Sequence, residues 1–451
     1  MQQQAKSMRV SVVGTGYVGL VTGVCLADQG HRVVCVDVDR RKVEMINSGN
    51  APIHEAGLPE LLKRHAGGNL RATSDLRTAV LESELTFIAV GTPASDGKID
   101  LRYVEAAAGE VGLALRDANH FHVVIVKSTV VPGTTAGPVV QQLEKASRKR
   151  AGVDFGVGMN PEFLTEGTAV QDFAHPDRLV FGAIDPRTHA TLERLYAGFG
   201  REVPRIATNT QTAEMIKYAS NAVLATMISF SNEIARLAAA VGQIDAVDVM
   251  RGVHASSYFT SRRAAEPVVA GITSFLLPGC GFGGSCLPKD VTALLGQGKA
   301  YGVPLPMLQS VLDINRGQVD ETLRLIAKHK PNLHDVSVAV LGIAFKPDTD
   351  DVRETPAFPI IRRLRAAGAR ITAYDPIARP ADHEDLRDVV MADSLAQAVQ
   401  SAEVVLLVTR WKEFEQLGAL LRGRTPQPLV VDGRRMLDPG AFEKFEAIGR
   451  G

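Results

Sequence analysis

Short apolar runs rich in valine and isoleucine recur along the first half of the chain, and each breaks directly into glycine, proline, serine or threonine. Segments with a helical pattern separate these runs. Such an alternation is typical of a parallel sheet that is buried on both faces. It predicts a doubly wound α/β domain, whose ligands bind beyond the carboxyl ends of the strands. The strand-and-turn segments are 8–20, 31–39, 85–93, 122–134 and 152–167.

The first of these segments carries a dinucleotide fingerprint. Gly14, Gly16 and Gly19 have the G-x-G-x-x-G spacing, which provides a tight turn, close approach to a pyrophosphate and close packing of a helix at about 17–29 on the strand. Asp37 ends the next strand about 20 residues later, where an acid binds the ribose hydroxyl of NAD rather than NADP. The alternative is a glycine turn without a ligand, with Asp37 as a helix cap.

The longest helical pattern covers residues 209–243 and contains no proline. Gly242 is a natural stop for this helix. About 30 helical residues extend about 45 Å, enough to bridge two lobes and to offer an interface for self-association. Lys217 and Asn221 lie four residues apart and project from one face. The pattern leaves Lys217 open as either a surface residue or a cation that points into a cleft.

The last third of the chain repeats the strand, loop, helix and strand pattern over 336–376, with further strands within 402–411 and 428–437. This part has Gly342 but lacks the full glycine fingerprint. Basic residues near its strand ends suit a phosphorylated ligand. They are Lys346, Arg353, Arg434 and Arg435.

These patterns together predict an α/β protein with two Rossmann-like doubly wound domains, joined by a long central helix and a small helical domain. The expected NAD-binding domain is 1–205. Residues 206–325 are expected to form a central helical dimerisation domain with a cysteine loop, and 326–451 the second Rossmann-like domain.

Polar residues follow the other strands of the first domain. Thr92, Ser128 and Thr129 come at strand ends and so are expected to face the cofactor, although turn chemistry explains each one nearly as well. Glu162 and Glu166 would share a face if a helix begins at Phe163.

Composition narrows the classes of function. Lys+Arg and Asp+Glu both number 50, and this balance argues against binding of nucleic acid. No apolar run is long enough to span a membrane. Residues 1–7 lack the apolar stretch of a signal peptide and are expected to form a polar leader. We therefore expect a cytoplasmic protein. Its four cysteines have no paired metal spacing, so we expect reduced thiols and no metal site.

The segment PGCGFGGSCLPKD (278–290) places Cys286 among glycines and just before Pro288. Glycines allow close approach of the backbone, and their N–H groups can face a ligand. If a helix begins near Pro288, its positive end lowers the pKa of the thiol. The alternative is a buried cysteine in a turn, which is the role we assign to Cys280.

A nicotinamide cofactor and a thiolate together predict an oxidation through a covalent intermediate. An alcohol loses a hydride to give an aldehyde, and the thiolate adds to the aldehyde to form a thiohemiacetal. Loss of a second hydride gives a thioester, which water releases as an acid. A simple alcohol dehydrogenase would not need the cysteine.

Seven motifs in order give the chain a resemblance to the UDP-glucose/GDP-mannose dehydrogenase family over nearly its whole length. They are GTGYVGL, VGTP, KSTV, NPEFLTEG, AEMIKYASNA, GFGGSCLPKD and GIAFKPDTDDVRETP, of which GFGGSCLPKD is the most specific. The resemblance implies two NAD-dependent oxidations at C6 of a nucleotide sugar, ending in a uronic acid. It also implies at least a dimer, formed through the long helix.

The resemblance implies roles for individual residues. Cys286 is the nucleophile, Lys217, Asn221 and Thr129 steady the oxyanion and the water, Asp290 acts as base or water organiser, and Glu162 assists hydrolysis or holds the substrate. The residues implied for NAD are Gly14, Gly16, Tyr17, Val18, Gly19, Asp37, Lys42, Thr92, Thr129, Glu166 and Arg353. Those implied for the nucleotide sugar, in addition to Glu162, Lys217 and Asn221, are Phe163, Leu164, Gly283, Lys346 and Arg434 or Arg435.

One segment departs from the family pattern. Enzymes for UDP-glucose usually carry an Arg-Ile-Gly segment before the cysteine loop, and its arginine reaches the partner's substrate. This chain has HASSYFTSRRAAEPVVAGITSFLLPGC (254–280) there, with Arg262 or Arg263 as possible replacements. UDP-glucose is the expected substrate, and the alternatives are GDP-mannose or another nucleotide sugar, or a binding module without catalysis. The intact Cys286, Lys217 and Asp290 speak against the last.

Overall fold

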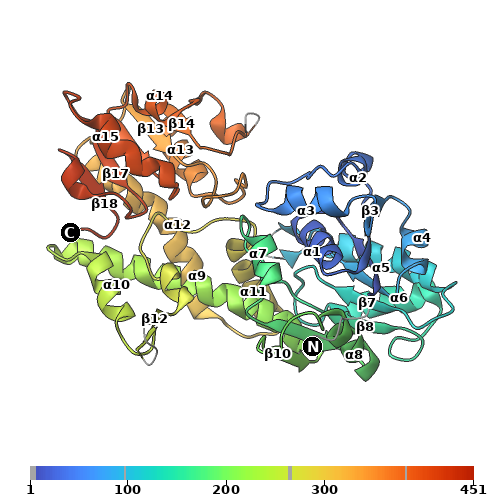
Figure 1. Ribbon diagram of the computed structural model, residues 1–451. Helices are drawn as coiled ribbons and strands as arrows, with labels where there is room; N and C mark the ends of the chain where they lie inside the picture. Colours follow the sequence, from blue (N-terminus) through green and yellow to red (C-terminus); the bar gives the residue numbers. More distant parts are fainter. Residues whose placement is uncertain (1–6, 96–97, 263–266, 381–382) are drawn as a thin grey trace. The chain divides into compact units, whose positions relative to one another are not determined.

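The computed structural model describes residues 7–95, 98–262, 267–380 and 383–451. Arg263 and most of the predicted polar leader fall outside these ranges. The chain divides into two compact units, Met1–Ala219 and Ser220–Gly451, which are described one at a time below (Figure 1). Among the described helices, none combines the length and the apolar character needed to cross a membrane.

A sheet of eight strands, counted over the described residues, forms the centre of the first unit. Its order is β10-β9-β8-β7-β4-β1-β2-β3. The strands are β1 (Arg9–Val13), β2 (Arg32–Val36), β3 (Leu70–Thr73), β4 (Leu85–Ile88), β7 (Val123–Val126), β8 (Gly156–Met159), β9 (Leu179–Ala183) and β10 (Arg205–Thr208). A small hairpin adds β5 (Ala94–Ser95) and β6 (Lys98–Ile99).

Helices connect these strands, as the alternation of patterns predicts. They are α1 (Tyr17–Asp28), α2 (Arg40–Asn47), α3 (Leu58–His65), α4 (Leu76–Leu81), α5 (Arg102–Leu115), α6 (Val140–Ser147), α7 (Ala169–Ala174) and α8 (Pro186–Leu195). Strands β3, β2, β1, β4, β7 and β8 pair in parallel. Strand β9 pairs antiparallel with β8, so the sheet is mixed at that edge, which a pattern of apolar runs cannot indicate.

Side chains of the central strands enter two cores, one on each face of the sheet. On β7, Val123 and Ile125 belong to one core, and Val124 and Val126 belong to the other. This follows from the period of two along a strand, and it explains why the runs are continuously apolar. The loops at the carboxyl ends of the strands are therefore held by a rigid sheet.

The second unit contains a six-stranded, wholly parallel sheet within the described residues, in the order β15-β14-β13-β16-β17-β18. The strands are β13 (Ser337–Leu341), β14 (Arg370–Tyr374), β15 (Val390–Met391), β16 (Val404–Leu407), β17 (Leu429–Asp432) and β18 (Phe445–Ala447). Helices of this unit are α10 (Ala246–His254), α11 (Leu287–Ala300), α12 (Pro306–Ala327), α13 (Ala357–Ala366), α14 (Leu395–Val399) and α15 (Leu417–Leu421). The pair β11 (Thr260–Ser261) and β12 (Val268–Val269) is separate from this sheet.

Helix α9 (Thr210–Val241) begins in the first unit and ends in the second. It ends at Gly242, which has a φ of 80°, a backbone conformation that glycine adopts without steric cost. The predicted long helix and the predicted fold class, with two α/β sheets and helices between them in the chain, are confirmed.

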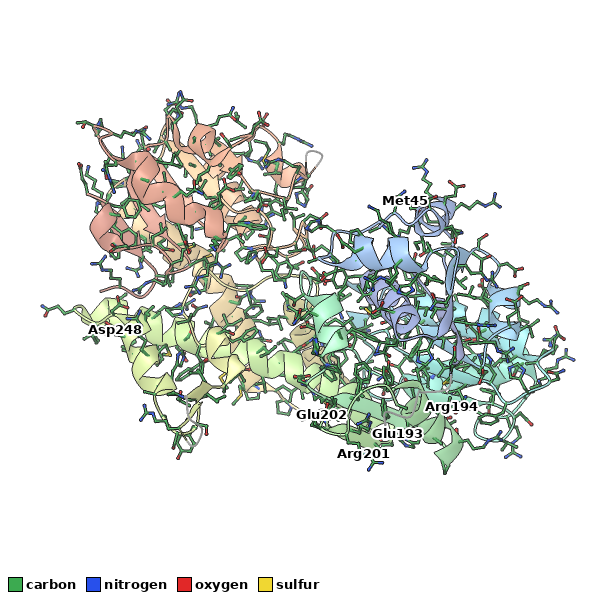
Figure 2. All side chains as sticks on the ribbon, viewed as in Figure 1. Met45, Glu193, Arg194, Arg201, Glu202 and Asp248 are labelled. Atoms are coloured by element: carbon green, nitrogen blue, oxygen red, sulfur yellow. The ribbon has the colours of Figure 1, made fainter. Side chains whose placement is uncertain are left out.

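Charged side chains cover the outer faces of the helices, as on α8 in Figure 2. Arg194 pairs with Glu84 at 2.9 Å, and Glu193 pairs with Arg205 at 3.3 Å. Exposed pairs of this kind contribute little individually to stability. They account for part of the charged residues of a chain with zero net charge, and they do not indicate a function.

Candidate functional site

The glycine turn after β1 has the geometry that its spacing predicts. The N–H of Gly14 donates to the Val36 carbonyl at 2.8 Å, with a φ of 97° that suits glycine. A Cβ at Gly19 would lie 1.9 Å from the Gly14 carbonyl oxygen, so only glycine permits this approach of α1 to the turn. A Cβ at Gly16 would meet no atom within 4 Å, which leaves this exposed backbone open at the start of α1.

Asp37 lies beside this turn at the carboxyl end of β2. Its Oδ2 accepts hydrogen bonds from the Thr15 N–H at 2.8 Å and from the Thr15 hydroxyl, and its Oδ1 accepts from the Asp39 N–H. Partial burial raises the pKa of Asp37, but these bonds and the charge of Lys42 outweigh burial and hold the pKa below its usual value. An ionised acceptor next to an open glycine turn fits the ribose and pyrophosphate of NAD.

The second sheet has a related turn that differs in one respect. Gly342 donates to the Tyr374 carbonyl at 2.8 Å with a φ of 96°, much as Gly14 does. The acid that follows, Asp375, is fully buried and accepts five hydrogen bonds, from the N–H groups of Ile343, Ala344, Ile377 and Ala378 and from the Trp411 indole. This carboxylate is satisfied by the protein, so the second turn does not repeat the dinucleotide site.

The hydroxyl residues after β4 and β7 connect neighbouring loops. Thr92 donates to the Thr129 carbonyl at 2.9 Å, and Ser128 donates to the Val90 carbonyl at 2.6 Å. Turn chemistry therefore accounts for the hydroxyl protons of Thr92 and Ser128, whose oxygens can still accept a hydrogen bond. Thr129, which follows Ser128, is partly buried.

Lys217 and Glu162 form a buried ion pair, with 2.9 Å between Nζ and Oε1. Lys217 is 4% exposed and Glu162 is 7% exposed. Of the two alternatives for Lys217, a surface residue is therefore excluded, and its ammonium group points inward. Burial raises the pKa of Glu162, but the charge and hydrogen bond of Lys217, the Leu164 N–H and the charge of Lys127 outweigh it and lower the pKa. Glu162 is thus held as a carboxylate inside the first unit.

A helix that begins at Phe163 is the condition for Glu162 and Glu166 to share a face, and this condition is not met. Residues 160–165 are not helical, and α7 begins only at Ala169. Glu162 instead accepts a hydrogen bond from the Leu164 N–H at 2.7 Å, which closes a local turn. Glu162 and Glu166 therefore do not share a helical face.

Glu55, which the sequence did not single out, contacts the start of α1 through Tyr17. It is 2% exposed and accepts from the Gly167 N–H at 2.7 Å, the Ala169 N–H at 2.8 Å and the Tyr17 hydroxyl. Burial and the bond to Glu55 raise the pKa of Tyr17 well above its usual range. Glu55 thus ties the glycine turn to the loop that carries Glu166. No spacing or pattern in the sequence distinguishes it from a surface acid.

In the second unit, Cys286 occupies the N-cap position of α11, as predicted, and is exposed. Asp290, one turn later, is fully buried. It accepts from Asn221 Nδ2 and from Lys289 Nζ, both at 2.6 Å. The unit thus brings Asn221 of α9 and Asp290 of the cysteine loop into direct contact. Cys280 is buried with its thiol 3.4 Å from the Val408 carbonyl, in agreement with a structural role.

The glycines before Cys286 pack against protein. A Cβ at Gly283 would lie 2.1 Å from the Glu354 carbonyl oxygen, and one at Gly284 would lie 2.7 Å from the Phe345 ring. The expectation that the glycine N–H groups of this loop face a ligand is wrong for Gly279 and Gly284, which donate to the Asn232 side chain and to the Arg353 carbonyl. The N–H groups of Cys280 and Phe282 also donate within the protein, to Gly433 and Asn315.

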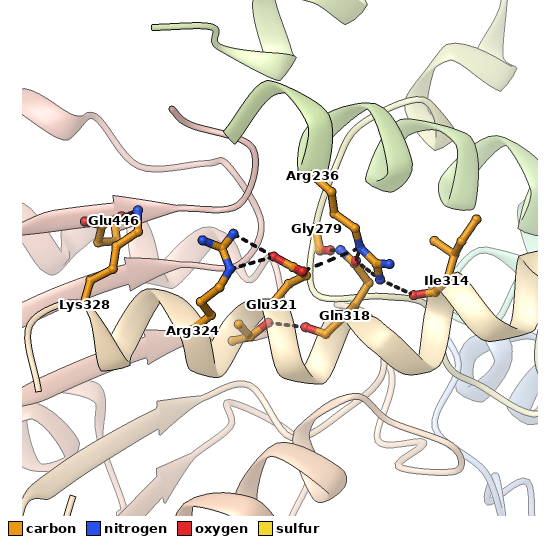
Figure 3. A network of polar contacts seen from close by, with 9 residues as sticks. Arg236, Gly279, Ile314, Gln318, Glu321, Arg324, Lys328 and Glu446 are labelled. Atoms are coloured by element: carbon orange, nitrogen blue, oxygen red, sulfur yellow. Dashed lines mark hydrogen bonds and ion pairs between the residues drawn. The ribbon is translucent and has the colours of Figure 1, made fainter. Parts of the chain in front are cut away.

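A polar network anchors the start of the loop to α9 and α12 (Figure 3). Gln318 donates to the Gly279 carbonyl at 2.7 Å and accepts from Arg236, which also donates to the Ile314 carbonyl at 2.8 Å. Glu321 lies 4.0 Å from Arg236 and pairs with Arg324. These residues hold the loop in place, and helical periodicity alone did not indicate them.

The basic residues of the second unit differ in their partners. Arg434 donates to the Gly281 carbonyl at 2.9 Å, next to the cysteine loop. Arg435 forms an ion pair with Asp245 before α10, which assigns it a structural contact. Arg353 pairs with Asp351 at 2.6 Å and remains largely exposed, and Lys346 lies near the Phe345 ring. Arg262 is exposed after β11, whereas Arg263 lies outside the described residues.

No group of histidine, cysteine and acidic residues that could hold a metal ion occurs among the residues searched, which are the described ones. The remaining predicted residues of the first unit lie near the glycine turn, near Asp37 or beside Glu162. Gly16, Tyr17 and Val18 lie at the start of α1, and Lys42 lies in α2 close enough to act on Asp37. Phe163 and Leu164 line a pocket of about 280 Å³ with Glu162.

Three models of one family match successive parts of the chain. The NAD-binding domain of the UDP-glucose/GDP-mannose dehydrogenase family matches residues 8–200, its central domain 211–317, and its UDP-binding domain 339–439. The NAD-binding match agrees with the geometry of the glycine turn and Asp37, and NAD is the cofactor of this chain.

Individual relatives match most or all of the chain. A UDP-glucose 6-dehydrogenase of Haloferax volcanii is 41% identical over 98% of this chain and 100% of its own length. A GDP-mannose 6-dehydrogenase of Pseudomonas putida is 38% identical over 91% of this chain and 93% of its own. The solved structure of a UDP-glucose dehydrogenase from Pyrobaculum islandicum is 36% identical, with a TM-score of 0.89 and full coverage of both chains. The chain therefore belongs to the UDP-glucose/GDP-mannose dehydrogenase family.

Proposed function

We propose that this chain is an NAD-dependent dehydrogenase that oxidises C6 of UDP-glucose in two steps to give UDP-glucuronate. The observation that carries the proposal is the position of Cys286 at the start of α11, one turn before the buried Asp290 and its partner Asn221. The high identity to UDP-glucose 6-dehydrogenases from several organisms supports the substrate. GDP-mannose is the second candidate, because its dehydrogenases are 36–40% identical to this chain.

Cys286 provides the covalent step. NAD, when bound, accepts the hydride that each of the two oxidations releases from C6. After the first oxidation, the Cys286 thiolate adds to the aldehyde carbon and forms a thiohemiacetal. After the second, the carbon is held as a thioester, which water cleaves to the carboxylate with return of the thiolate. The sum is one alcohol and one water converted to an acid, with two hydrides and the balancing protons released.

The charged residues act on the oxyanion and on the water. Lys217 provides a positive charge that steadies the developing oxyanion or the water, and Thr129 and Asn221 have the same role as hydrogen-bond donors. Asp290 accepts the proton of the alcohol or of the water. Glu162, kept ionised by Lys217, assists the hydrolysis.

The remaining proposed residues bind the two ligands. NAD is bound by the glycine turn with Tyr17 and Val18, by Asp37 and Lys42, and by Thr92, Thr129, Glu166 and Arg353. The nucleotide sugar is bound by Phe163, Leu164, Gly283, Lys346 and Arg434, and the contact of Arg434 with Gly281 supports its choice over Arg435.

The number of NADH molecules formed per sugar tests this function. The purified protein is given excess NAD and a limiting amount of UDP-glucose, GDP-mannose or UDP-N-acetylglucosamine. We expect two NADH for each UDP-glucose consumed. Two per GDP-mannose would change the substrate and keep the chemistry, whereas one per sugar would contradict the covalent second oxidation. No NADH with any sugar would contradict the function.

Removal of the Asp37 carboxylate should weaken NAD binding. The Asp37→Ala change removes the ionised acceptor beside the glycine turn, and we expect a loss of about 1–3 kcal/mol in a calorimetric titration with NAD. Asp185→Ala is the matched control, because Asp185 caps α8 in the same unit through the Thr188 N–H. It should lower stability and leave NAD affinity unchanged. Equal affinities for the Asp37 variant and the parent would remove Asp37 from the site.

The assembly and location stay predictions. Exposed apolar side chains on α9 support a homodimer or higher oligomer formed through this helix, since Val223, Phe230 and Leu237 repeat every seven residues on one face. A mass of 48.3 kDa by light scattering, that of one chain, would contradict it. We also propose domain boundaries at 205/206 and 325/326 and a cytoplasmic location, which limited proteolysis and fractionation would test.

A further inference from the structure

Lys127 is a buried lysine that the roles above do not use. It directly follows β7 and is 4% exposed. Its Nζ donates to the Asn160 side-chain oxygen at 2.9 Å and lies 3.4 Å from the Asn160 carbonyl oxygen. Burial lowers the pKa of Lys127 to about 8, with the charge of Glu162 acting against burial and that of Lys217 adding to it. Burial of an ammonium group costs free energy unless hydrogen bonds or opposite charges replace the water that the group loses.

Asn160 connects this lysine to the loop of Glu162. Its Oδ1 also accepts from the Tyr196 hydroxyl at 2.6 Å, and its Nδ2 donates to the Val180 carbonyl at 2.9 Å. The Asn160 N–H donates to the Val126 carbonyl at 3.0 Å. With its amide held on both sides, Asn160 fixes the backbone two residues before Glu162.

Lys127 and Glu162 also line one pocket of about 280 Å³ within the first unit. Two ammonium groups, those of Lys127 and Lys217, therefore act on a single buried carboxylate. The pocket wall has further charged or titratable groups on α7, on the segment after it and at the end of α8. They are Asp172, His175, Asp177, Arg178 and Tyr196.

We propose that Lys127 is a positioning residue of the active site, whose buried ammonium fixes Asn160 at the start of the Glu162 loop and provides a second positive charge for the Glu162 carboxylate. The inference rests on the proposed function and deepens it, because it identifies a second cation beside Glu162. Without Lys127, the charges of Lys217 and Glu162 would cancel, and no net positive charge would be left to steady an oxyanion. With Lys127, the cluster keeps one positive charge in excess.

The test compares the pH dependence of kcat/KM for the parent, three test variants and one control variant. Lys127→Met removes both the hydrogen bond and the charge, and Lys127→Gln keeps a donor without charge. Tyr196→Phe removes the other donor to Asn160 and leaves the charge in place. Lys149→Met is the matched control, since Lys149 donates to the Leu115 and Ala118 carbonyls in the same unit without contact to Asn160.

We expect the acidic limb of the profile to move up by roughly one pH unit in both Lys127 variants, since a carboxylate that loses a nearby cation protonates at higher pH. In Tyr196→Phe, kcat should fall severalfold with the limb unmoved, and Lys149→Met should change stability alone. An unmoved limb in Lys127→Met and Lys127→Gln would overturn the proposal. Failure of both variants to fold would also overturn it, because Lys127 would then be purely structural.

A second measurement does not depend on turnover, so failure of the proposed function would leave it informative. Urea unfolding of Lys127→Met, Glu162→Gln and the double variant gives the coupling between the two residues. We expect the Glu162→Gln change to cost less in the Lys127→Met background than in the parent. Additive effects would contradict the proposal even if no sugar were oxidised.

Discussion

Cys286→Ser should abolish the release of acid, and the NADH formed per sugar should fall from two to one or less. The serine hydroxyl is far less nucleophilic than the thiolate, so the aldehyde is not captured for the second oxidation. We expect the rate of uronate formation to fall at least about 10³-fold, as for other catalytic nucleophiles. The measurement is NADH absorbance together with chromatographic separation of sugar, aldehyde and acid.

Cys280→Ser is the control for this variant. Cys280 lies six residues earlier in the same loop, is 1% exposed and has its thiol 3.4 Å from the Val408 carbonyl. A serine there can still donate to that carbonyl, so the stoichiometry should stay at two. Full uronate formation by Cys286→Ser would exclude the thioester mechanism.

Lys217→Met should affect both stability and catalysis. The change leaves the Glu162 carboxylate buried without its ion-pair partner, and breaking a buried pair in this way costs about 3–5 kcal/mol. Loss of the charge at the developing oxyanion should lower kcat by about 10²–10³-fold. Urea unfolding at pH 7 measures the first effect, and steady-state kinetics at the same pH measures the second.

The effect of pH has a defined sign. The pKa of Glu162 is lowered in the folded parent, so its pair contributes stability above the pKa of the unfolded chain, about 4.3, and loses it as pH falls through the folded value. In Lys217→Met, only the Leu164 N–H and the charge of Lys127 still act against burial, so the balance at Glu162 moves toward the neutral acid. The difference between parent and variant should therefore shrink as the pH is lowered toward 4.

Two further variants control the interpretation. Lys217→Met with Glu162→Gln should recover part of the lost stability, since neither member of the Lys217–Glu162 pair is left charged without the other. Lys330→Met breaks a surface pair with Glu403 and should cost less than about 1 kcal/mol. A cost as small as this for Lys217→Met would mean that water or another residue compensates Glu162.

Local patterns predict a large part of the fold. The apolar runs correspond to β1, β2, β4, β7 and β8, because period, length and turn residues are local properties. The same holds for α9, and for α11, which begins after Cys286 at Leu287. The antiparallel pairing of β9 with β8 was not predicted, since strand direction depends on how the chain returns to the sheet.

The candidate functional residues also fall into two groups, those that a local motif indicates and those that only contacts in the folded chain reveal. Local motifs predict the chemistry, since the glycine spacing, Asp37 and the cysteine loop each have a physical meaning in the sequence alone. The folded chain adds three contacts that no motif predicts: Lys217 lies inside with Glu162, Asp290 contacts Asn221, and Asp375 is satisfied by the protein. The reason is that burial and hydrogen-bond partners depend on residues far apart in the chain, which no local pattern encodes. The contacts of Lys127 with Asn160 and of Glu55 with Gly167 are of the same kind.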